Sequence, residues 1–157
     1  MKKLVEEDIP NILMVCQGNS VYYKYYKYYK SEPTNENIKD SMRALPSNKS
    51  IDDKYFVGFY NEDRLVAVLD LITGYPNEDV VYIGWFIMNK EFQGSGVGTA
   101  IIEDIILYLK EDFSYVKLGY IKGNPQAENF WKKNKFRPVG NEVETDSYTI
   151  VNMQRAL

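Results

Sequence analysis

Three glycines separated by single residues lie between an apolar run and a long amphipathic stretch. They are Gly94, Gly96 and Gly98 in the segment QGSGVGT, which follows the apolar residues VVYIGWFIM closely. Glycine lets the backbone approach a ligand, and successive N–H groups at such a turn, with the N-terminus of a following helix, bind anions. A plain strand-to-helix connection is the alternative, but it does not require three alternating glycines. The turn therefore predicts a phosphate-binding site.

Two common nucleotide-binding patterns do not fit this turn. A Walker loop requires Lys followed by Ser or Thr after its last glycine, whereas Thr99 and Ala100 follow Gly98. A dinucleotide fingerprint that begins at Gly94 places Thr99 where its third glycine or alanine belongs. The surrounding elements also do not alternate as they do in a doubly wound sheet. The turn thus favours a phosphate ligand of another kind.

The segment from Gln93 to Gly98 resembles the Q/R-x-x-G-x-G/A motif of the GNAT superfamily of N-acetyltransferases. Asn124, Ala127 and the segment FWKKNKF at 130–136 resemble that superfamily's downstream N-x-x-A-x-x-F-Y-x-K-x-G-F segment. The resemblance covers residues 54–140 well, and the N-terminal third only by the order of its helices. It implies a single GNAT-like domain over residues 1–157 that transfers acetyl from acetyl-CoA to a primary amine of a small molecule or peptide.

The resemblance also implies where acetyl-CoA binds. Its pyrophosphate rests on the amides of residues 94–99, and its pantetheine arm runs beside the preceding strand like an added strand. Asn124 then hydrogen-bonds the pantetheine or the thioester end, although a helix cap is the alternative role for this residue. The residues implied to contact the cofactor are Phe86, Ile87, Met88, Gln93, Gly94, Ser95, Gly96, Val97, Gly98, Thr99, Asn124, Ala127, Phe130, Trp131 and Lys133.

The sequence departs from the superfamily at the tyrosine that usually protonates the CoA thiolate, because Trp131 occupies that place. Indole has no proton to give at a useful pKa. Either the thiolate leaves without a donor or another phenol serves, with Tyr120 and Tyr148 as candidates that are otherwise core or rim tyrosines. The same departure motivates a second hypothesis, a CoA-binding regulatory module without catalysis.

The chain contains no histidine, so a proton must be moved by a carboxylate, tyrosine, lysine, the backbone or water. Candidate bases are Glu78 or Asp79 at the start of a strand, and Asp70 within VAVLDLI. A carboxylate in an apolar strand is costly unless it is partnered or functional, which favours Asp70. A solvent-facing aspartate is the alternative. Cys16 has no histidine to activate it, and we expect no metal.

Paired tyrosines alternate with single lysines in VYYKYYKYYK, residues 21–30. Helical spacing predicts one stripe that contains Tyr22, Tyr25, Tyr26 and Tyr29. In the GNAT superfamily the first helices lie over the acceptor end of the cleft, so the resemblance implies that this stripe walls the acceptor pocket. Packing within a helix core is the alternative. A nucleic-acid platform is a third function hypothesis, which the net charge of -3 disfavours.

The elements that must position these residues read in the order α, α, β-hairpin, β, α, β, α, β, β. The first predicted helix begins at Ile9, where Asp8 can provide a cap, and breaks at Gly18. Further helices are predicted over 35–44, 96–110 and 125–134. Strands are predicted over 54–60, 64–72, 80–88 and 115–121 and within KFRPVG and DSYTIVNMQR. The mixture predicts an α+β fold with a largely antiparallel central sheet flanked by helices.

The length and composition of the chain limit the number of domains and the classes of binding partner. A chain of 157 residues fits one domain, and its pI near 5.1 argues against general nucleic-acid binding. No apolar run approaches the roughly 20 residues that cross a bilayer, and acidic residues interrupt the N-terminus before it could serve as a signal peptide. We therefore expect a cytoplasmic protein with no nucleic-acid or membrane partner, for which a homodimer is one possible assembly.

Overall fold

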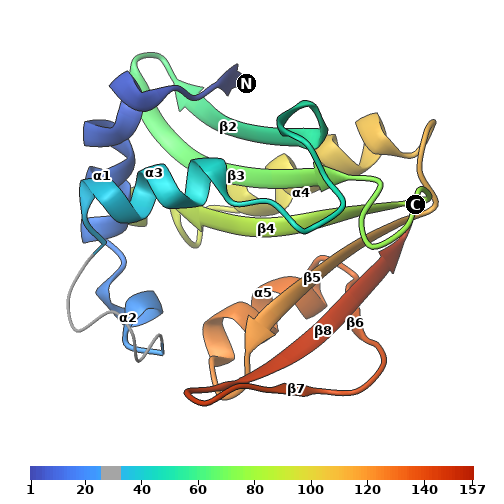
Figure 1. Ribbon diagram of the computed structural model, residues 1–157. Coiled ribbons are helices and arrows are strands. Elements are labelled where there is room, and N and C mark those ends of the chain that lie inside the picture. The colour runs from blue at the N-terminus through green and yellow to red at the C-terminus, as the bar shows by residue number, and fades with distance from the viewer. Residues whose placement is uncertain (26–32) are drawn as a thin grey trace.

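The computed structural model describes residues 1–25 and 33–157 (Figure 1). Its helices are α1 (Ile9–Gln17), α2 (Ser20–Tyr23), α3 (Asn35–Arg43), α4 (Val97–Leu109) and α5 (Pro125–Lys133). Its strands are β1 (Lys2–Lys3), β2 (Lys54–Asn61), β3 (Arg64–Thr73), β4 (Val80–Met88), β5 (Tyr115–Ile121), β6 (Arg137–Pro138), β7 (Val143–Glu144) and β8 (Thr149–Ala156). Every element predicted within these ranges is present, and the short strands β1 and β7 are additional.

All these strands belong to one mixed sheet, in which the order is β1-β2-β3-β4-β5-β8-β6 and β7 pairs with β8. The β2–β3 hairpin and the other adjacent pairs are antiparallel, and only β4 and β5 run parallel. Helices α1 and α3 cover one face of the sheet, while α4 and α5 lie behind the opposite face (Figure 1). The predicted α+β class and largely antiparallel sheet are confirmed.

Strands β4 and β5 separate partway along their length. They pair only from Val80 to Ile83, beside Tyr115 to Leu118, and then diverge, which leaves the opening visible in Figure 1. Gly84 is the first residue of β4 after this pairing ends. On the β3 side, Asp70 pairs with Trp85 and Leu71 pairs with Ile83, so Gly84 is an extra residue in a β-bulge. The second half of β4 therefore has one edge on β3 and one edge without a strand partner.

The two faces of the sheet carry separate cores. Leu69 and Leu71 of β3 pack with the apolar side of α4, whereas Val68 packs with α1 and α3 on the other face. This alternation is the period of two expected for a strand buried on both faces. Asp70 has the same parity as Val68 and therefore projects toward the α1–α3 face.

The carboxylate of Asp8 has a different role from the predicted one. Asp8 precedes α1 but does not cap it, because its carboxylate accepts hydrogen bonds from Val5 N at 2.9 Å and Lys2 Nζ at 3.0 Å. The cap role predicted for Asp8 is thus replaced by a contact that ties the first strand to the turn before α1.

In the described parts of the chain, no helix combines the length and apolar character needed to span a membrane.

Candidate active site

The glycine turn presents a row of backbone donors. Gln93 N donates to Lys90 O at 3.2 Å, and Ala100 N donates to Gly96 O at 3.0 Å. Between them, the amides of residues 94–99 donate no hydrogen bond to any described residue, and no side chain caps α4. These amides lie at the positive end of a helix, so they can bind an anion without the help of a lysine.

The three glycines serve this turn for two different reasons. Gly94 has a φ of 76° and Gly96 a φ of 89°, and a Cβ at either position would meet nothing within 4 Å. Backbone conformation, rather than space, requires glycine there. A Cβ at Gly98 would instead overlap Met88 Sδ and lie 3.2 Å from the ring of Phe130. Gly98 therefore lets α4 approach β4 and α5 closely.

The turn forms one end of a cavity of about 310 Å³ between the diverging halves of β4 and β5. Nearly all residues predicted to contact the cofactor line it: Phe86, Ile87, Met88, Gln93, Gly94, Gly96, Gly98, Thr99, Asn124, Ala127, Phe130, Trp131 and Lys133. Ser95 and Val97 are predicted contacts that do not line it, and Ser95 Oγ donates outside the cavity, to Phe92 O at 2.6 Å. We call this space the cofactor cavity.

The register of β4 determines which of its backbone groups face this cavity. Asn89 N donates to Val66 O at 2.8 Å, which marks Val66 and Asn89 as a hydrogen-bonded pair of the β3–β4 ladder. Hydrogen-bonded pairs alternate with non-hydrogen-bonded pairs in antiparallel strands. Ile87 therefore bonds to β3, whereas the N–H and C=O groups of Phe86 and Met88 point toward the opening. Phe86 can pair with an extended ligand there through both groups, and Met88 through its N–H, because Met88 O already accepts side-chain hydrogen bonds.

An amide network holds the end of β4. Met88 O accepts hydrogen bonds from Asn19 Nδ2 at 2.8 Å and from Gln93 Nε2 at 3.0 Å. Gln93 Nε2 also donates to Asn19 Oδ1 at 2.7 Å, and Gln93 Oε1 accepts from Gln126 Nε2 at 3.2 Å. Gln93 thus uses its side chain to connect α5 and the α1–α2 junction to β4. Asn19, which sequence analysis did not identify, lines the same cavity.

Asn124 and two aromatic residues lie on the α5 side of the cofactor cavity. Asn124 Oδ1 accepts from Ala127 N at 3.1 Å, so the helix cap is present, while Asn124 Nδ2 donates to no described residue. Phe130 stacks on Phe86 at 5.5 Å, and Trp131 packs edge-on to Phe130 at 4.9 Å and to Phe136 at 5.1 Å between ring centroids. Trp131 is buried and lines the cavity without offering a phenol.

Tyr120 supplies a phenol at the cofactor cavity. It lies on β5 and lines the cavity while 9% of its surface is exposed. Burial, followed by the nearby carboxylate of Glu128, raises the pKa of the Tyr120 hydroxyl. The phenol therefore retains its proton at neutral pH. Tyr148, the other predicted donor, lines neither of the two cavities described here.

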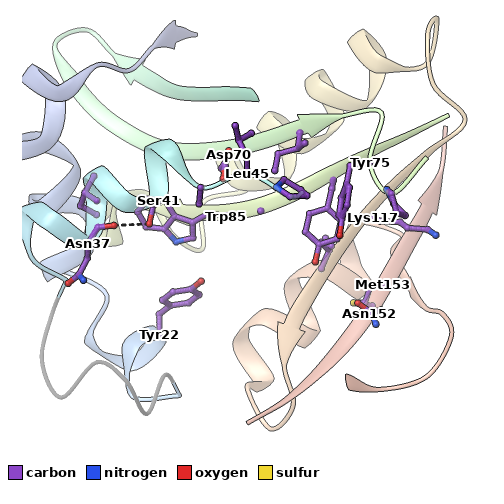
Figure 2. Close-up of a pocket in the computed structure, with 18 of the residues that line it drawn as sticks. Tyr22, Asn37, Ser41, Leu45, Asp70, Tyr75, Trp85, Lys117, Asn152 and Met153 are labelled. Carbon is purple, nitrogen blue, oxygen red and sulfur yellow. Dashed lines mark hydrogen bonds between the residues drawn. The ribbon is translucent and has the colours of Figure 1, made fainter. Parts of the chain in front are cut away.

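A second cavity, of about 840 Å³, opens on the α1–α3 face of the sheet. Figure 2 shows Asp70 and Trp85 of the sheet above it, Tyr22 and Ser41 on one side, and Asn152 and Met153 of β8 on the other. Tyr22, Gly84, Trp85 and Leu118 line both cavities, so the two spaces meet where β4 and β5 separate. We call the second space the acceptor cavity.

Asp70 is the carboxylate of the acceptor cavity. Its Oδ2 accepts from Lys54 Nζ at 2.7 Å, and Lys54 Nζ also donates to Ala44 O at 3.0 Å. Oδ1 of Asp70 is buried and accepts no hydrogen bond from the described residues. Burial raises the pKa of the Asp70 carboxyl, and the hydrogen bond and charge of Lys54 oppose that rise. The Asp70 carboxyl therefore has a higher pKa than an exposed aspartate.

Gly84 explains how this carboxylate reaches the junction of the cavities. A Cβ at Gly84 would lie 2.8 Å from Asp70 Oδ2, so a side chain there would displace the carboxylate. Neither Gly84 nor Lys54 was identified from the sequence. The glycine inside an apolar strand was the available indication, because such a residue often marks a bulge or a close approach.

The remaining predicted residues are dispersed. Glu78 is exposed on the turn between β3 and β4 and lines neither cavity. Tyr22 lines both cavities, whereas Tyr25 lines neither and has Lys24 Nζ over its ring at 5.1 Å. The predictions for Tyr26 and Tyr29 fall outside the described residues. Tyr75 and Tyr82 line the acceptor cavity, although sequence analysis did not single them out.

Comparison with known proteins identifies the family and the fold of this chain. The chain matches the model of the Acetyltransferase (GNAT) family over residues 20–136. An acetyltransferase from Thermus thermophilus is 19% identical, with a TM-score of 0.79 over 99% of this chain and 95% of that chain. No curated protein matches the sequence at a significant level.

Two further solved structures share the fold. The ribosomal-protein-S18-alanine N-acetyltransferase from Escherichia coli is 14% identical, with a TM-score of 0.68 over 99% of this chain and 91% of that chain. A spermidine N-acetyltransferase from Vibrio cholerae, in complex with CoA and spermine, is 17% identical, with a TM-score of 0.68 over 99% and 93% of the two chains. Because the family match spans most of the chain and the architecture agrees, this protein belongs to the GNAT family and is an acetyltransferase.

Proposed function

We propose that this protein transfers the acetyl group of acetyl-CoA to a primary amine of a small molecule or peptide. The observation that carries the proposal is the meeting of two cavities at the point where β4 and β5 separate. One cavity ends in a row of unpaired amides, and the other contains a buried carboxylate. A donor and an acceptor can therefore approach the same point from opposite faces of the sheet, which removes much of the entropic cost of bringing two reactants together.

The residues of the cofactor cavity fit acetyl-CoA. The free amides of residues 94–99 would hold its pyrophosphate. The N–H and C=O groups of Phe86 and the N–H group of Met88 would pair with its pantetheine amides. Asn124 Nδ2 is a further donor on the α5 side. When bound there, acetyl-CoA would supply the acetyl group as a reactive thioester.

Asp70 would act as the base. A protonated amine cannot attack a carbonyl carbon, so the acceptor must first lose a proton. Asp70 lines the acceptor cavity and lies against Gly84 at the junction, and burial raises the pKa of its carboxyl. These properties support direct or water-mediated transfer of the proton from the amine to the carboxylate. Lys54 would hold the carboxylate in place throughout.

Tyr120 would act as the acid. As the new C–N bond forms and the C–S bond breaks, the sulfur takes the electron pair of the broken bond and needs a proton or a stabilising donor. Tyr120 lines the cofactor cavity, and the raised pKa of its hydroxyl keeps it protonated. Trp131 occupies the place of the usual tyrosine and can shape the cavity but not donate this proton.

The relatives support an amine acceptor of unspecified type. One solved structure of the same fold is named for the N-acetylation of alanine in ribosomal protein S18, and another for that of spermidine.

A direct test measures the release of free CoA from acetyl-CoA with a panel of primary amines, alongside calorimetric titration of acetyl-CoA. We expect calorimetric binding and amine-dependent release for at least one amine. Binding of acetyl-CoA with no release for any amine would instead favour the regulatory module, for which the absence of a phenol at Trp131 is the structural argument. Absence of binding would contradict both functions.

A further inference from the structure

The acceptor cavity carries very little charge for its size. Among the described residues that line it, Asp70 and Lys117 are the only ones with ionisable side chains that are charged at neutral pH. Asp70 is already paired with Lys54, which is buried behind it. The carboxylate is therefore balanced before any acceptor arrives, and no second carboxylate lines this cavity within the described residues.

Three polar side chains that line the cavity make hydrogen bonds within the protein. Ser41 Oγ donates to Asn37 O at 2.9 Å, and Asn37 Oδ1 accepts from Thr34 N at 2.9 Å. Asn152 Nδ2 donates to Asn141 O at 3.3 Å. These hydrogen bonds leave fewer polar atoms for the regularly spaced polar groups of a peptide backbone or a polyamine.

Most of the remaining surface is aromatic or aliphatic. Tyr75 and Tyr82 pack edge to face with centroids 5.6 Å apart, and Trp85 leans on Phe56 at 6.0 Å. Tyr22, Pro46, Leu45, Ile72 and Met153 continue this surface. Rings held by their neighbours in this way provide a rigid apolar wall that can stack on a ligand ring or lie beside a single ammonium group.

We propose that the acceptor is a small monoamine with an aromatic body, an inference that rests on the proposed function. Its ring would lie among Tyr75, Tyr82 and Trp85, and its one amine would approach Asp70 at the junction with the cofactor cavity. A second ammonium on the same molecule would enter a space that already contains Lys117 and lies beside Lys54, and the described residues offer no further carboxylate to pair it. Burial of an unpaired charge is costly, so the cavity selects against polyamines.

The wild-type protein provides the first test. The rate of CoA release would be measured with 2-phenylethylamine, with spermidine and with an alanine-initiated tripeptide. We expect kcat/KM for 2-phenylethylamine to exceed that for each of the others by about tenfold or more, the range that pocket complementarity provides. Equal or higher values for spermidine or the tripeptide would overturn the acceptor class while leaving the transferase function intact. Absence of release with every amine would overturn both.

A pair of variants tests the electrostatic argument separately. Leu45→Asp adds a carboxylate to the acceptor cavity, whereas Ile51→Asp adds one at an exposed site that lines neither cavity. We expect Leu45→Asp to raise the ratio of kcat/KM for spermidine to that for 2-phenylethylamine by about fivefold, the scale of one partly exposed charge pair. Ile51→Asp should leave that ratio within about twofold of wild type. Equal ratios in the two variants would contradict the proposal.

Calorimetric titration of acetyl-CoA accompanies each variant. The residue at position 45 lies on the acceptor side of the sheet, outside the cofactor cavity, so affinity for acetyl-CoA should match wild type in both variants. A matched affinity shows that the protein is folded, so a change in the amine ratio then reports on the acceptor cavity alone.

Discussion

The two cavities are built from different parts of the chain. The cofactor cavity depends on backbone groups, namely the amides of residues 94–99 and the outward edge of β4 at Phe86 and Met88. The acceptor cavity depends on side chains from α2, α3, β3, β4, β5 and β8, which meet only in the folded protein. Backbone groups are the same in every sequence, so the first site is suited to an invariant ligand. The second site can change with single substitutions.

The contrast extends to charge. The cofactor cavity attracts an anion through a helix terminus and unpaired N–H groups. The acceptor cavity instead contains a carboxylate that a buried lysine already neutralises in part. One side is therefore prepared for a highly charged ligand and the other for a nearly neutral one. This contrast is consistent with the proposed attack of an uncharged amine on a thioester whose charge lies elsewhere in the molecule.

The largest expected effect is on the acceptor side, at Asp70. Asp70→Asn should lower kcat/KM by about 10²- to 10⁴-fold, the usual contribution of a general base, with acetyl-CoA affinity unchanged. Because burial raises the pKa of Asp70, wild-type activity should decline as pH falls through that pKa. Steady-state rates across pH would show this acidic limb in the wild type and its loss in the variant.

A second variant separates catalysis from stability at this pair. Asp70→Asn leaves Lys54 buried without its carboxylate, and such a broken pair costs about 3–5 kcal/mol of folding free energy. Replacing both residues, as Asp70→Leu with Lys54→Met, removes both charges and should restore much of the free energy of unfolding. Recovery of stability without recovery of transfer would assign Asp70 to the chemistry. Recovery of both would leave Asp70 a purely structural role.

The next largest effect is expected at the glycine turn of the cofactor cavity. Gly96→Glu places a negative side chain where the amides would hold the pyrophosphate, so affinity for acetyl-CoA should fall about 10- to 1000-fold. Gly123→Glu is a matched control, because Gly96 has a φ of 89° and Gly123 a φ of 87°, with nothing within 4 Å of a Cβ at either site. Both variants should lose similar thermal stability. Equal losses of affinity, measured by calorimetry, would show that strain rather than ligand contact is responsible.

The same contrast explains what the sequence could predict of the fold. Strands, helices and the glycine turn follow local periods, so their positions agree with the structure to within a few residues. The bulge at Gly84 does not follow such a period. Strict alternation would put Ile83 and Trp85 on one face, yet Ile83 packs toward α4 and Trp85 toward α1. The bulge turns Trp85 into the acceptor cavity, and only the pairing with β3 reveals it.

Most residues predicted to contact the cofactor line one cavity in the structure, whereas most residues of the acceptor cavity were not predicted. The cofactor residues lie in two short segments with fixed spacing, so a motif contains them. Lys54 and Asp70 are 16 residues apart on adjacent strands, and their contact depends on the register of the β2–β3 hairpin. Tyr75 and Tyr82 face the acceptor cavity because of the β3–β4 turn and the start of β4. Hydrophobic pattern alone cannot distinguish such tyrosines from core tyrosines.

A smaller effect, on stability, is expected at the ion pair between Arg155 and Glu103. Arg155 of β8 donates to both carboxylate oxygens of Glu103 on α4, at 2.9 and 2.8 Å, and to Asn134 O after α5 at 3.0 Å. The hydrogen bonds from Arg155 lower the pKa of Glu103 from 4.5 to about 2, despite an opposing effect of desolvation, and Lys135 contributes further. This stabilisation is complete above pH 4.5 and is lost as pH falls toward 2.

Glu103→Gln should therefore lower the free energy of unfolding at pH 7 by about 1–2 kcal/mol, a value reduced for the partial exposure of Glu103. Denaturant titrations at several pH values should show a smaller acid-dependent loss in the variant than in the wild type. The control is Asp104→Asn, an exposed neighbour on the same helix, which should change stability by less than about 0.5 kcal/mol. An unchanged acid profile in Glu103→Gln would mean that the ion pair contributes little.

The smallest effect should occur at the rim of the cofactor cavity. Lys133 lines the cavity and makes no ion pair with the described residues, whereas Lys132, its neighbour on α5, pairs with Glu128 and lines neither cavity. An exposed lysine that contacts a phosphate contributes about 0.5–1 kcal/mol, so Lys133→Ala should weaken acetyl-CoA binding about two- to fivefold. Lys132→Ala should leave it nearly unchanged. Added salt should reduce the difference between the two variants, because an exposed charge is screened. A salt-independent difference would place the loss in packing along α5 instead, and the charge contrast between the cavities would then depend on the glycine turn alone.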